Sequence, residues 1–430
     1  MIDYLSILEK IETTQHQLPQ WQDLNQFVGE FHLFWCKLGN IIQQQLVQAH
    51  IEQTEARYHG ARTKRPKRYY TPLGEMVIQR RVYPTANGLE VKADKQLGLP
   101  PEKWLPQVLE LACALGVSSE FPNAHQLFVQ WTGINLTEKT LANQVEDTGN
   151  QLEKLQLELE TPHHKQTQKP SNIDTSEIEN ILYVGVDGVM TPLNNNQGYK
   201  EAKVGVIFWS SDHDKSNQKR GRIRNREYVA TLKSRHEFRN SVKTLFHEIV
   251  GQTQPKTVVI GDGAHWIWDM ASEQFPGSIE ILDFFHLSEY VWAVAKAAYP
   301  NQEVNQKDWV KFQQNLLKQS QWQNVIKNCH QLKGKKQELR EAISNLERYL
   351  YNNQTRIDYQ SYRRAGLMIG SGVVESSNRR VVTQRLKQAG MHWSKKGAEG
   401  VMALRALYLS SAHRWSNFWL QKSKCQGLLA

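Results

Sequence analysis

The sequence predicts an α/β protein with a mixed sheet in its second half and a mainly helical first half. Three observations support this prediction. Apolar runs after residue 180 are typical of buried strands, and an amphipathic helix separates the third run from the fourth. At residues 301–365, leucines and aromatic residues recur at helical intervals instead, which predicts an all-helical insertion. The polar stretch at residues 161–179 contains proline and no periodicity, and we interpret it as a linker.

The composition favours a polyanionic partner. The 430 residues include 53 Lys and Arg against 43 Asp and Glu, which gives a net charge of +10 and a pI near 9.2. Such a balance suits nucleic acid. The four cysteines form no CxxC pair, so neither a zinc ribbon nor a disulfide framework is expected. With no signal peptide and no long apolar run, we expect a cytoplasmic, nucleoid-associated protein.

The first hundred residues combine a helix with a basic hairpin. Residues 1–60 are predicted to be helical, with Phe31 and Trp35 among the apolar anchors. Residues 61–100 begin with the basic run RTKRPKR and continue into a short hairpin, in which Met76 and Ile78 alternate with polar neighbours. The run is either a solvated connector or a phosphate-binding segment. In the second case the contacts come from Arg62, Lys64, Arg65, Lys67 and Arg68.

Residues 101–160 have the layout of a helix-turn-helix. Pro101 opens a helix that Gly116 is expected to stop. The next helix ends at Gly133, a tight turn follows, and Thr137 caps a further helix. In a helix-turn-helix this last helix lies in the major groove of DNA. The residues facing DNA are then Lys139, Thr140, Asn143 and Gln144. An ordinary helical hairpin has the same spacing and remains the alternative.

The mixed sheet is predicted to lie in residues 180–300, and its domain resumes at residues 366–430 with two helices. Three strands are indicated by NILYVGVDGVMTPL, KEAKVGVIFWSS and REYVATLKS. The amphipathic helix HEFRNSVKTLFHEIVGQ follows, and then come strands in KTVVIGDGAHW and IEILDFFHL. The segment DKSNQKRGRIRNR is a further candidate contact with DNA, through Lys219, Arg220, Arg222 and Arg224. The insertion carries a cationic group that either tracks DNA or is solvated, formed by Lys333, Lys335 and Lys336.

Two aspartates stand at the ends of predicted strands. Asp187 and Asp262 each lie in an Asp-Gly step after an apolar run. If the two strands are neighbours, the carboxylates lie side by side and repel each other, so that one of them is forced to protonate. A divalent cation removes that cost, and oxygen ligands suit Mg²⁺ or Mn²⁺. Two unrelated acids that cap loops or helices are the alternative.

A third acid, Glu375, lies in the predicted helix of MIGSGVVESSNRRVVTQRLKQAGMHW. With a turn of about 100° per residue, Glu375 falls on the same arc as the apolar residues of that helix. These residues are Val374, Val381, Val382 and Leu386. A glutamate on a buried arc requires a cation. The cation is either Arg379, one turn later, or a metal ion that the two aspartates already hold.

Together these motifs resemble the DDE transposases. The strings GDGAHWIW, LDFFHLSEY, GSGVVESSNRRVVTQRLKQAGMHWS and ALRALYLSS are similar to ISKra-type insertion-sequence transposases, which are related to the Mutator-like group. The resemblance covers roughly residues 100–420. It implies an RNase H-like core with Asp187, Asp262 and Glu375 as the catalytic triad on the first strand, the fourth strand and a late helix. Relatives often carry a cysteine-paired zinc ribbon near the basic hairpin, but this chain lacks those cysteines, and no zinc is expected.

The resemblance also implies a reaction and its partners. Transposon-end phosphodiesters are hydrolysed, and the freed 3′-hydroxyl then attacks target DNA. Two Mg²⁺ or Mn²⁺ ions are implied. Asp187 is expected to bind both ions, Asp262 to bind one and Glu375 to bind the other. The partner is double-stranded DNA, and a homodimer or larger assembly is expected because two ends must be paired. Arg379 and Arg385 are expected to neutralise phosphates.

Several residues keep more than one interpretation. Asp283 and His286 match a D-x-x-H motif of these enzymes. His286 either contacts DNA or metal-bound water, or is a core histidine bonded to Asp283. Trp393 either stacks on a splayed base or packs in the core, and Lys387 is a further candidate for DNA contact.

Two other function classes fit parts of the sequence. One is a catalytically inactive DNA-binding protein derived from a transposase. The other is a HAD-type Mg²⁺-dependent phosphatase, which VDGVMT and GDGAHWIWDM faintly resemble. That class requires aspartates where this chain has Val189 and Trp266, which argues against it.

Overall fold

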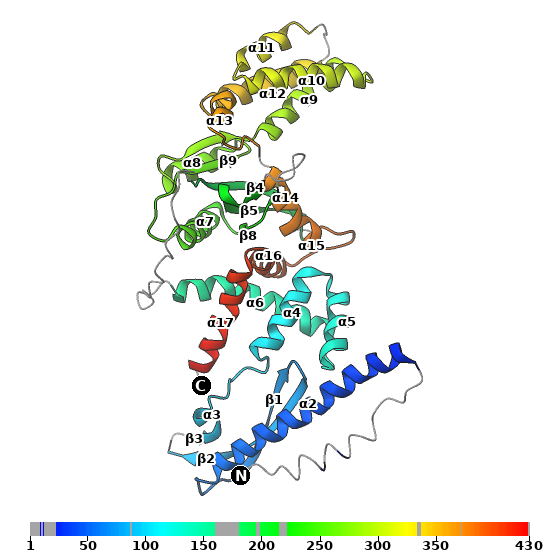
Figure 1. The fold of residues 1–430 in the computed structure, drawn as a ribbon, viewed down its shortest axis with the longest axis vertical. Coiled ribbons are helices and arrows are strands. Elements are labelled where there is room, and N and C mark those ends of the chain that lie inside the picture. Colours follow the sequence, from blue (N-terminus) through cyan, green and yellow to red (C-terminus); the bar gives the residue numbers. More distant parts are fainter. Residues whose placement is uncertain are drawn as a thin grey trace. The chain divides into compact units, whose positions relative to one another are not determined.

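The computed structural model describes residues 23–86, 88–159, 180–194, 198–214, 222–332, 337–370 and 372–428, together with residues 9 and 12. The chain forms two compact units, Met1–Leu155 with Ala412–Ala430 and Gln156–Ser411 (Figure 1). Several predictions fall outside the described residues. These are the linker at residues 161–179, the DNA contacts Lys219 and Arg220, and the insertion lysines Lys333, Lys335 and Lys336.

The first unit begins with a long helix packed on a hairpin. Its elements are α2 (Leu24–Glu55), β1 (Thr63–Thr71), β2 (Gly74–Thr85), β3 (Gly88–Glu90) and α3 (Lys92–Gln96). The basic run is not a connector before the hairpin, because it forms β1 itself and pairs antiparallel with β2. Met76 and Ile78 are buried in the core cluster with Ile51 of α2, which confirms their predicted alternation. Of the expected helix anchors, Phe31 and Trp35 are exposed.

Three helices and the C-terminal helix complete this unit. They are α4 (Pro106–Ser118), α5 (Phe121–Thr132), α6 (Glu138–Leu159) and α17 (Ala412–Leu428). Gly133 ends α5 in a left-handed conformation, and Thr137 Oγ1 caps α6 by accepting from the Thr140 amide at 3.2 Å, as predicted. Gly116 does not stop α4. It lies inside the helix, where a Cβ atom would come within 2.8 Å of Val145 on α6, so its role is to allow close helix packing.

The C-terminal helix belongs to the first unit and not to the domain of the mixed sheet, where we had expected it. Trp415 Nε1 donates to Glu110 Oε1 on α4 at 2.8 Å, and Trp419 is buried. The aromatic side chains of α17 therefore supply apolar surface to the helices of the N-terminal unit. The sheet's domain ends before α17, near Ser411.

The second unit contains a five-stranded mixed sheet in the order β10-β9-β4-β5-β8. The strands are β4 (Leu182–Pro192), β5 (Tyr199–Trp209), β8 (Glu227–Thr231), β9 (Thr257–Gly261) and β10 (Ile279–Leu282). β5 is antiparallel to both β4 and β8, whereas β4, β9 and β10 run parallel to one another. The short strands β6 (His213–Asp214) and β7 (Arg222–Ile223) pair separately. The predicted α/β class with a mixed sheet is confirmed.

Helices cover both faces of this sheet. A Cβ atom on Gly205 of β5 would contact Phe238 and Val242 of α7 (Arg235–Val250), and one on Gly185 of β4 would overlap Val374 of α14 (Gly372–Asn378). Gly205 pairs with Val186, the neighbour of Gly185, and successive residues point to opposite faces. The two helices therefore lie on opposite faces. Beyond β9 follows α8 (His265–Gln274).

The helical insertion begins earlier than predicted. It starts with α9 (Phe284–Ala298), directly after β10, and continues through α10 (Glu303–Lys318), α11 (Trp322–His330), α12 (Gln337–Asn352) and α13 (Tyr359–Arg364). Leu339, Leu346 and Leu350 of α12 are buried, as their helical spacing predicts. After α14, the chain forms a π-helical segment (Arg379–Thr383), α15 (Gln384–Leu386) and α16 (Lys395–Leu409). Among the described residues, no helix is both long and apolar enough to span a membrane.

Gly185 tests the packing of α14 on the sheet. Gly185→Ala is expected to lower the free energy of unfolding by about 1–3 kcal/mol, because the new methyl group would overlap Val374 and displace α14. Gly372→Ala, at the start of the same helix, has open space and is the matched control. Chemical denaturation of both variants checks this, and equal stability of the two would contradict it.

Candidate active site

The parallel pairing of β4 and β9 brings Asp187 and Asp262 together. The last pair in register is Val186 with Gly261, and each aspartate is the next residue of its chain. Asp187 continues along β4, while Asp262 opens the loop that leads into α8. Both side chains are half-buried. The two strands are therefore neighbours, which is the arrangement in which the two carboxylates are expected to repel each other.

The Asp187 carboxylate is held by two donors. Oδ1 accepts from the Gly188 amide at 2.7 Å, and Oδ2 accepts from Asn378 Nδ2 of α14 at 2.5 Å. Burial raises the pKa of Asp187 to about 6, the Gly188 amide lowers it, and the charge of Asp262 raises it further. Asp187 is thus an acid whose ionised form is disfavoured in the folded protein.

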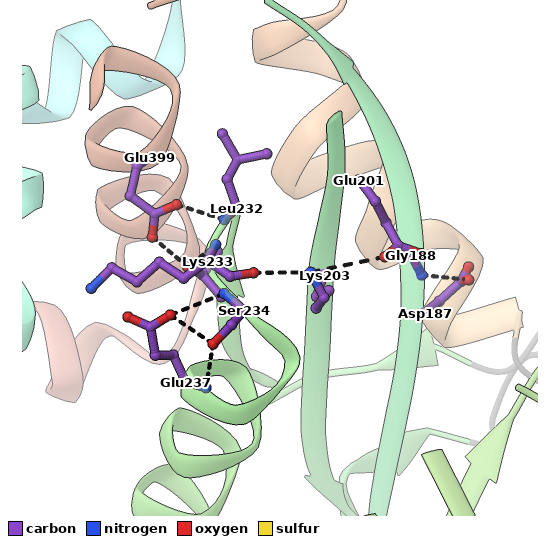
Figure 2. Close-up of polar contacts among 10 residues, drawn as sticks. Asp187, Gly188, Glu201, Lys203, Leu232, Lys233, Ser234, Glu237 and Glu399 are labelled. Carbon is purple, nitrogen blue, oxygen red and sulfur yellow. Dashed lines mark hydrogen bonds and ion pairs between the residues drawn. The ribbon is translucent and has the colours of Figure 1, made fainter. Parts of the chain in front are cut away.

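The charged residues on the other face of β4 and β5 do not join this pair. Figure 2 shows Asp187 and Gly188 on β4 beside Glu201 and Lys203 on β5. Lys203 pairs in register with Gly188, so its side chain lies on the face opposite Asp187. The buried Lys203 Nζ lies 3.8 Å from Glu201 and donates to the Lys233 carbonyl at 3.0 Å. The charges of Lys203 and Glu201 compensate each other, and Lys203 does not neutralise the two aspartates.

The Asp262 turn is held from the helical insertion. Asp262 Oδ1 accepts from the Ala264 amide at 3.0 Å, and the Asp262 carbonyl accepts from the Tyr349 hydroxyl of α12 at 2.5 Å. Gly263 has φ 93°, and a Cβ atom there would come within 2.9 Å of the Tyr349 ring. The left-handed glycine and the tyrosine therefore fix the path of the chain just after the acid.

Asp283 and His286 lie in the same neighbourhood. The negative charge of Asp283 raises the pKa of Asp187, and a positive charge on His286 lowers it, so both residues act on Asp187. The buried Asp283 caps α9 by accepting from the Phe285 amide at 2.8 Å. His286 is not a core histidine, because its side chain is 35% exposed, with Nδ1 3.5 Å from Glu289. Its ring contacts those of Tyr290 and Tyr349.

Glu375 is exposed, and the prediction that it lies on a buried arc is wrong. The apolar residues of the predicted arc are buried, but the π-helical segment at Arg379–Thr383 changes the number of residues per turn. Positions before and after it therefore do not share one helical phase. Within the described residues, no ion pair joins Glu375 to Arg379, which is exposed as well.

Asn378, which the sequence analysis does not predict as a site residue, is the side chain of α14 that contacts Asp187. It follows Glu375 by three residues and Val374 by four, so it lies on the face of α14 that packs against the sheet. The signal was available in the sequence, because an amide on the buried side of this helix needs a polar partner as much as a glutamate does.

Two predicted DNA contacts are buried instead. Arg385 is 1% exposed, and its guanidinium lies 5.0 Å from the centre of the Trp393 ring. Trp393 is also buried, and its Nε1 donates to the Leu386 carbonyl at 3.0 Å. The core-packing interpretation of Trp393 is confirmed, and the prediction that Arg385 faces a phosphate is not supported. Lys387 is exposed.

In the parts of the chain that are described, no three His, Cys, Asp or Glu side chains are grouped so that they could hold a metal ion. The donors that are brought together are the carboxylates of Asp187 and Asp262, with the amide of Asn378 beside them. Oxygen donors of this kind suit Mg²⁺ or Mn²⁺. A cation would offset both the burial that raises the pKa of Asp187 most and the smaller effect of the Asp262 charge.

The predicted DNA contacts of the first unit lie mostly at its surface. Arg62, Lys64, Arg65 and Arg68 of the basic run are exposed. Lys67 is half-buried and donates to the Pro100 carbonyl at 2.6 Å, and Arg68 pairs with Glu75 at 3.1 Å, so these two are already engaged.

The candidate recognition helix is accessible as well. On α6, the side chains of Lys139, Thr140 and Asn143 are exposed and Gln144 is half-buried. In the second unit Arg224 is exposed, whereas the side chain of Arg222 lies outside the described part of the chain.

The fold and the acid pair define a mixed α/β protein with an aspartate site on two neighbouring parallel strands, where Asp187 lies within β4 and Asp262 follows β9. The chain belongs to the uncharacterised protein family UPF0236, whose model matches residues 31–423 and so runs through both compact units. A Streptococcus gallolyticus protein described as "UPF0236 protein in vanSb 3′region" is 24% identical over 328 residues. The match covers 72% of this chain and 65% of that relative's length.

Asp187 is expected to destabilise the fold near neutral pH. Because its pKa rises from 3.8 to about 6 on folding, its contribution is most favourable at low pH and is lost as the pH rises through 6. Asp187→Asn should therefore raise the free energy of unfolding by about 1–3 kcal/mol at pH 7.5 in EDTA. The gap should shrink as the pH falls toward 4. A variant less stable than wild type at pH 7.5 would contradict this.

Tyr349 is expected to anchor the insertion to the acid site. Tyr349→Phe leaves the Asp262 carbonyl without its donor and should lower the free energy of unfolding by about 1–2 kcal/mol. Tyr351→Phe, on an exposed ring of the same helix, should change it by less than about 0.5 kcal/mol. Thermal or urea unfolding distinguishes them, and equal effects would rule out the anchor.

Proposed function

We propose that this chain is a DDE-type DNA transposase, which cleaves transposon-end phosphodiesters with divalent metal ions and transfers the freed strand to target DNA. The observation that supports this most is that two parallel, hydrogen-bonded strands place Asp187, within β4, beside Asp262, which directly follows β9. Within the five-stranded sheet, β4 is the first strand along the chain and β9 is the fourth. This is the arrangement that the RNase H-like resemblance implies for the first two acids.

The reaction assigns distinct tasks to the residues of the site. Asp187 and Asp262 would supply the negative oxygens that hold Mg²⁺ or Mn²⁺, and the Gly188 amide and Asn378 keep Asp187 oriented. A metal held there would supply activation of the attacking oxygen and stabilisation of the leaving oxygen in an in-line displacement. Glu375 lies on the helix that carries Asn378, and its exposed carboxylate is available to complete the triad when DNA is bound.

The same proposal gives the N-terminal unit the task of DNA recognition. Arg62, just before β1, and Lys64 and Arg65 on β1 are exposed and can contact phosphates without sequence preference. α6 is proposed as the recognition helix of a helix-turn-helix, with the exposed side chains of Lys139 and Asn143 facing base edges. A protein that pairs two transposon ends is expected to act as a dimer or larger assembly on DNA.

DNA nicking tests the proposal. The substrate is a plasmid that carries the DNA flanking this gene, incubated with the protein and Mg²⁺ or Mn²⁺. Wild type should cut at discrete positions, and Asp262→Asn should lose at least about 100-fold of that rate, because the transition-state charge loses its metal. Asp269→Asn, on an exposed carboxylate of α8, is the matched control and should cut as wild type does.

Glu375→Gln separates catalytic from structural acids. It should abolish cutting without changing the free energy of unfolding, because the glutamate is exposed. Full cutting by Glu375→Gln would exclude it from the triad, and cutting by Asp262→Asn would overturn the proposed reaction.

A catalytically inactive DNA-binding protein is the second candidate. The exposure of Glu375 and the lack of a three-ligand group among the described residues favour it. It predicts that wild type and Asp262→Asn bind the flanking DNA equally and that neither cuts it.

A further inference from the structure

Asn378 makes the only side-chain contact between α14 and the Asp187 carboxylate among the hydrogen bonds of the described residues. The amide is 9% exposed, and its Nδ2 lies 2.5 Å from Asp187 Oδ2. Because Asp187 Oδ1 accepts from the Gly188 amide, each oxygen of the carboxylate has one fixed donor. A carboxylate whose two oxygens each accept a hydrogen bond cannot rotate freely about the Cβ–Cγ bond.

The other end of the Asn378 amide is buried without a partner. Its Oδ1 has no hydrogen-bond donor within reach among the described residues, although the side chain is more than nine-tenths buried. A buried polar atom left unpaired costs about 1–3 kcal/mol, so an unfilled oxygen beside two acids indicates a place for a ligand. Such a ligand is cationic or donates a hydrogen bond, because Oδ1 can only accept.

The backbone of this segment keeps Asn378 in place. Val374, one turn earlier, packs where Gly185 leaves no side chain on β4, and the π-helical segment begins at the residue that follows Asn378. Single-turn π segments are frequent at functional sites, where they re-aim side chains. Asn378 faces the sheet from the last position of α14, and Val381 and Val382, within the π-helical segment, are buried as well.

We infer that Asn378 is a positioning residue of the proposed metal site, which orients Asp187 through Nδ2 and presents Oδ1 to the bound cation or its hydration shell. The presence of a metal in this inference rests on the proposed function, whereas the contact between Asn378 and Asp187 is observed in the structure. Partners that orient a metal ligand typically change metal affinity by 10- to 100-fold when they are removed.

Mn²⁺ binding tests the role of Asn378 directly. Titration calorimetry of the full chain is expected to give a dissociation constant about 10- to 100-fold weaker in Asn378→Ala than in wild type. Ser377→Ala is the matched control, because this buried hydroxyl lies on the same helix but donates to the Val373 carbonyl and not to Asp187. It should bind as wild type does. Equal affinity of wild type and Asn378→Ala would overturn the inference while leaving the proposed function intact.

A double-mutant cycle in EDTA tests the contact itself without any metal. Asp187→Ala, Asn378→Ala and the double variant are unfolded in urea, and coupled residues give a double effect that differs from the sum of the single effects. Additive effects would overturn the pairing. If Asn378→Ala fails to fold, Asn378→Ser replaces it in both experiments, because the shorter side chain cannot reach Asp187 but keeps a polar atom. Absence of Mn²⁺ binding by wild type would overturn the metal site, and with it both the inference and the proposed function.

Discussion

The parallel pairing of β4 with β9 is the constraint on which the rest of the candidate site depends. It places the carboxylate of Asp187, within β4, beside that of Asp262, directly after β9, and burial and mutual repulsion raise the pKa of Asp187 there. Folding therefore creates a local electrostatic cost that a purely structural protein has no reason to keep. The surrounding elements hold the acids in position despite that cost, because the Asn378 amide fixes one carboxylate and the Tyr349 hydroxyl fixes the turn after the other. A bound cation is the simplest partner that turns this cost into binding energy.

The sheet and its acids could be predicted because their signals are local. Apolar runs of strand length, an amphipathic helix and the two Asp-Gly steps are contained within short windows of sequence. The helical insertion was found in the same way, from its leucine spacing, although its first helix begins at Phe284 and not at residue 301. The order of the strands in the sheet was not predicted, because the pairing of β4 with β9 joins segments about 75 residues apart, and no local pattern encodes it.

The features that sequence reasoning missed depend on tertiary structure. The π-helical segment changes the helical phase after Asn378, so the buried positions of Val381, Val382 and Leu386 do not place Glu375 on the buried side, and Asn378 is the polar residue of α14 that contacts Asp187. Arg385 was predicted to neutralise a phosphate in the reaction that the resemblance implies, but its guanidinium packs on a tryptophan in the interior. Gly116 looked like a helix stop, and only the approach of α6 explains why a glycine stands there. In each case the partner lies outside the helix that carries the residue, and periodicity alone does not identify it.

The central claim is that Asp187 and Asp262 together hold a divalent cation, and a crystal soaked in Mn²⁺ tests it most directly. Anomalous diffraction from manganese locates the ion without any assumption about activity or DNA sequence. The account predicts an anomalous peak between the two carboxylates that disappears in crystals of Asp262→Asn. A peak that persists in that variant, or manganese bound only elsewhere on the chain, would contradict the account.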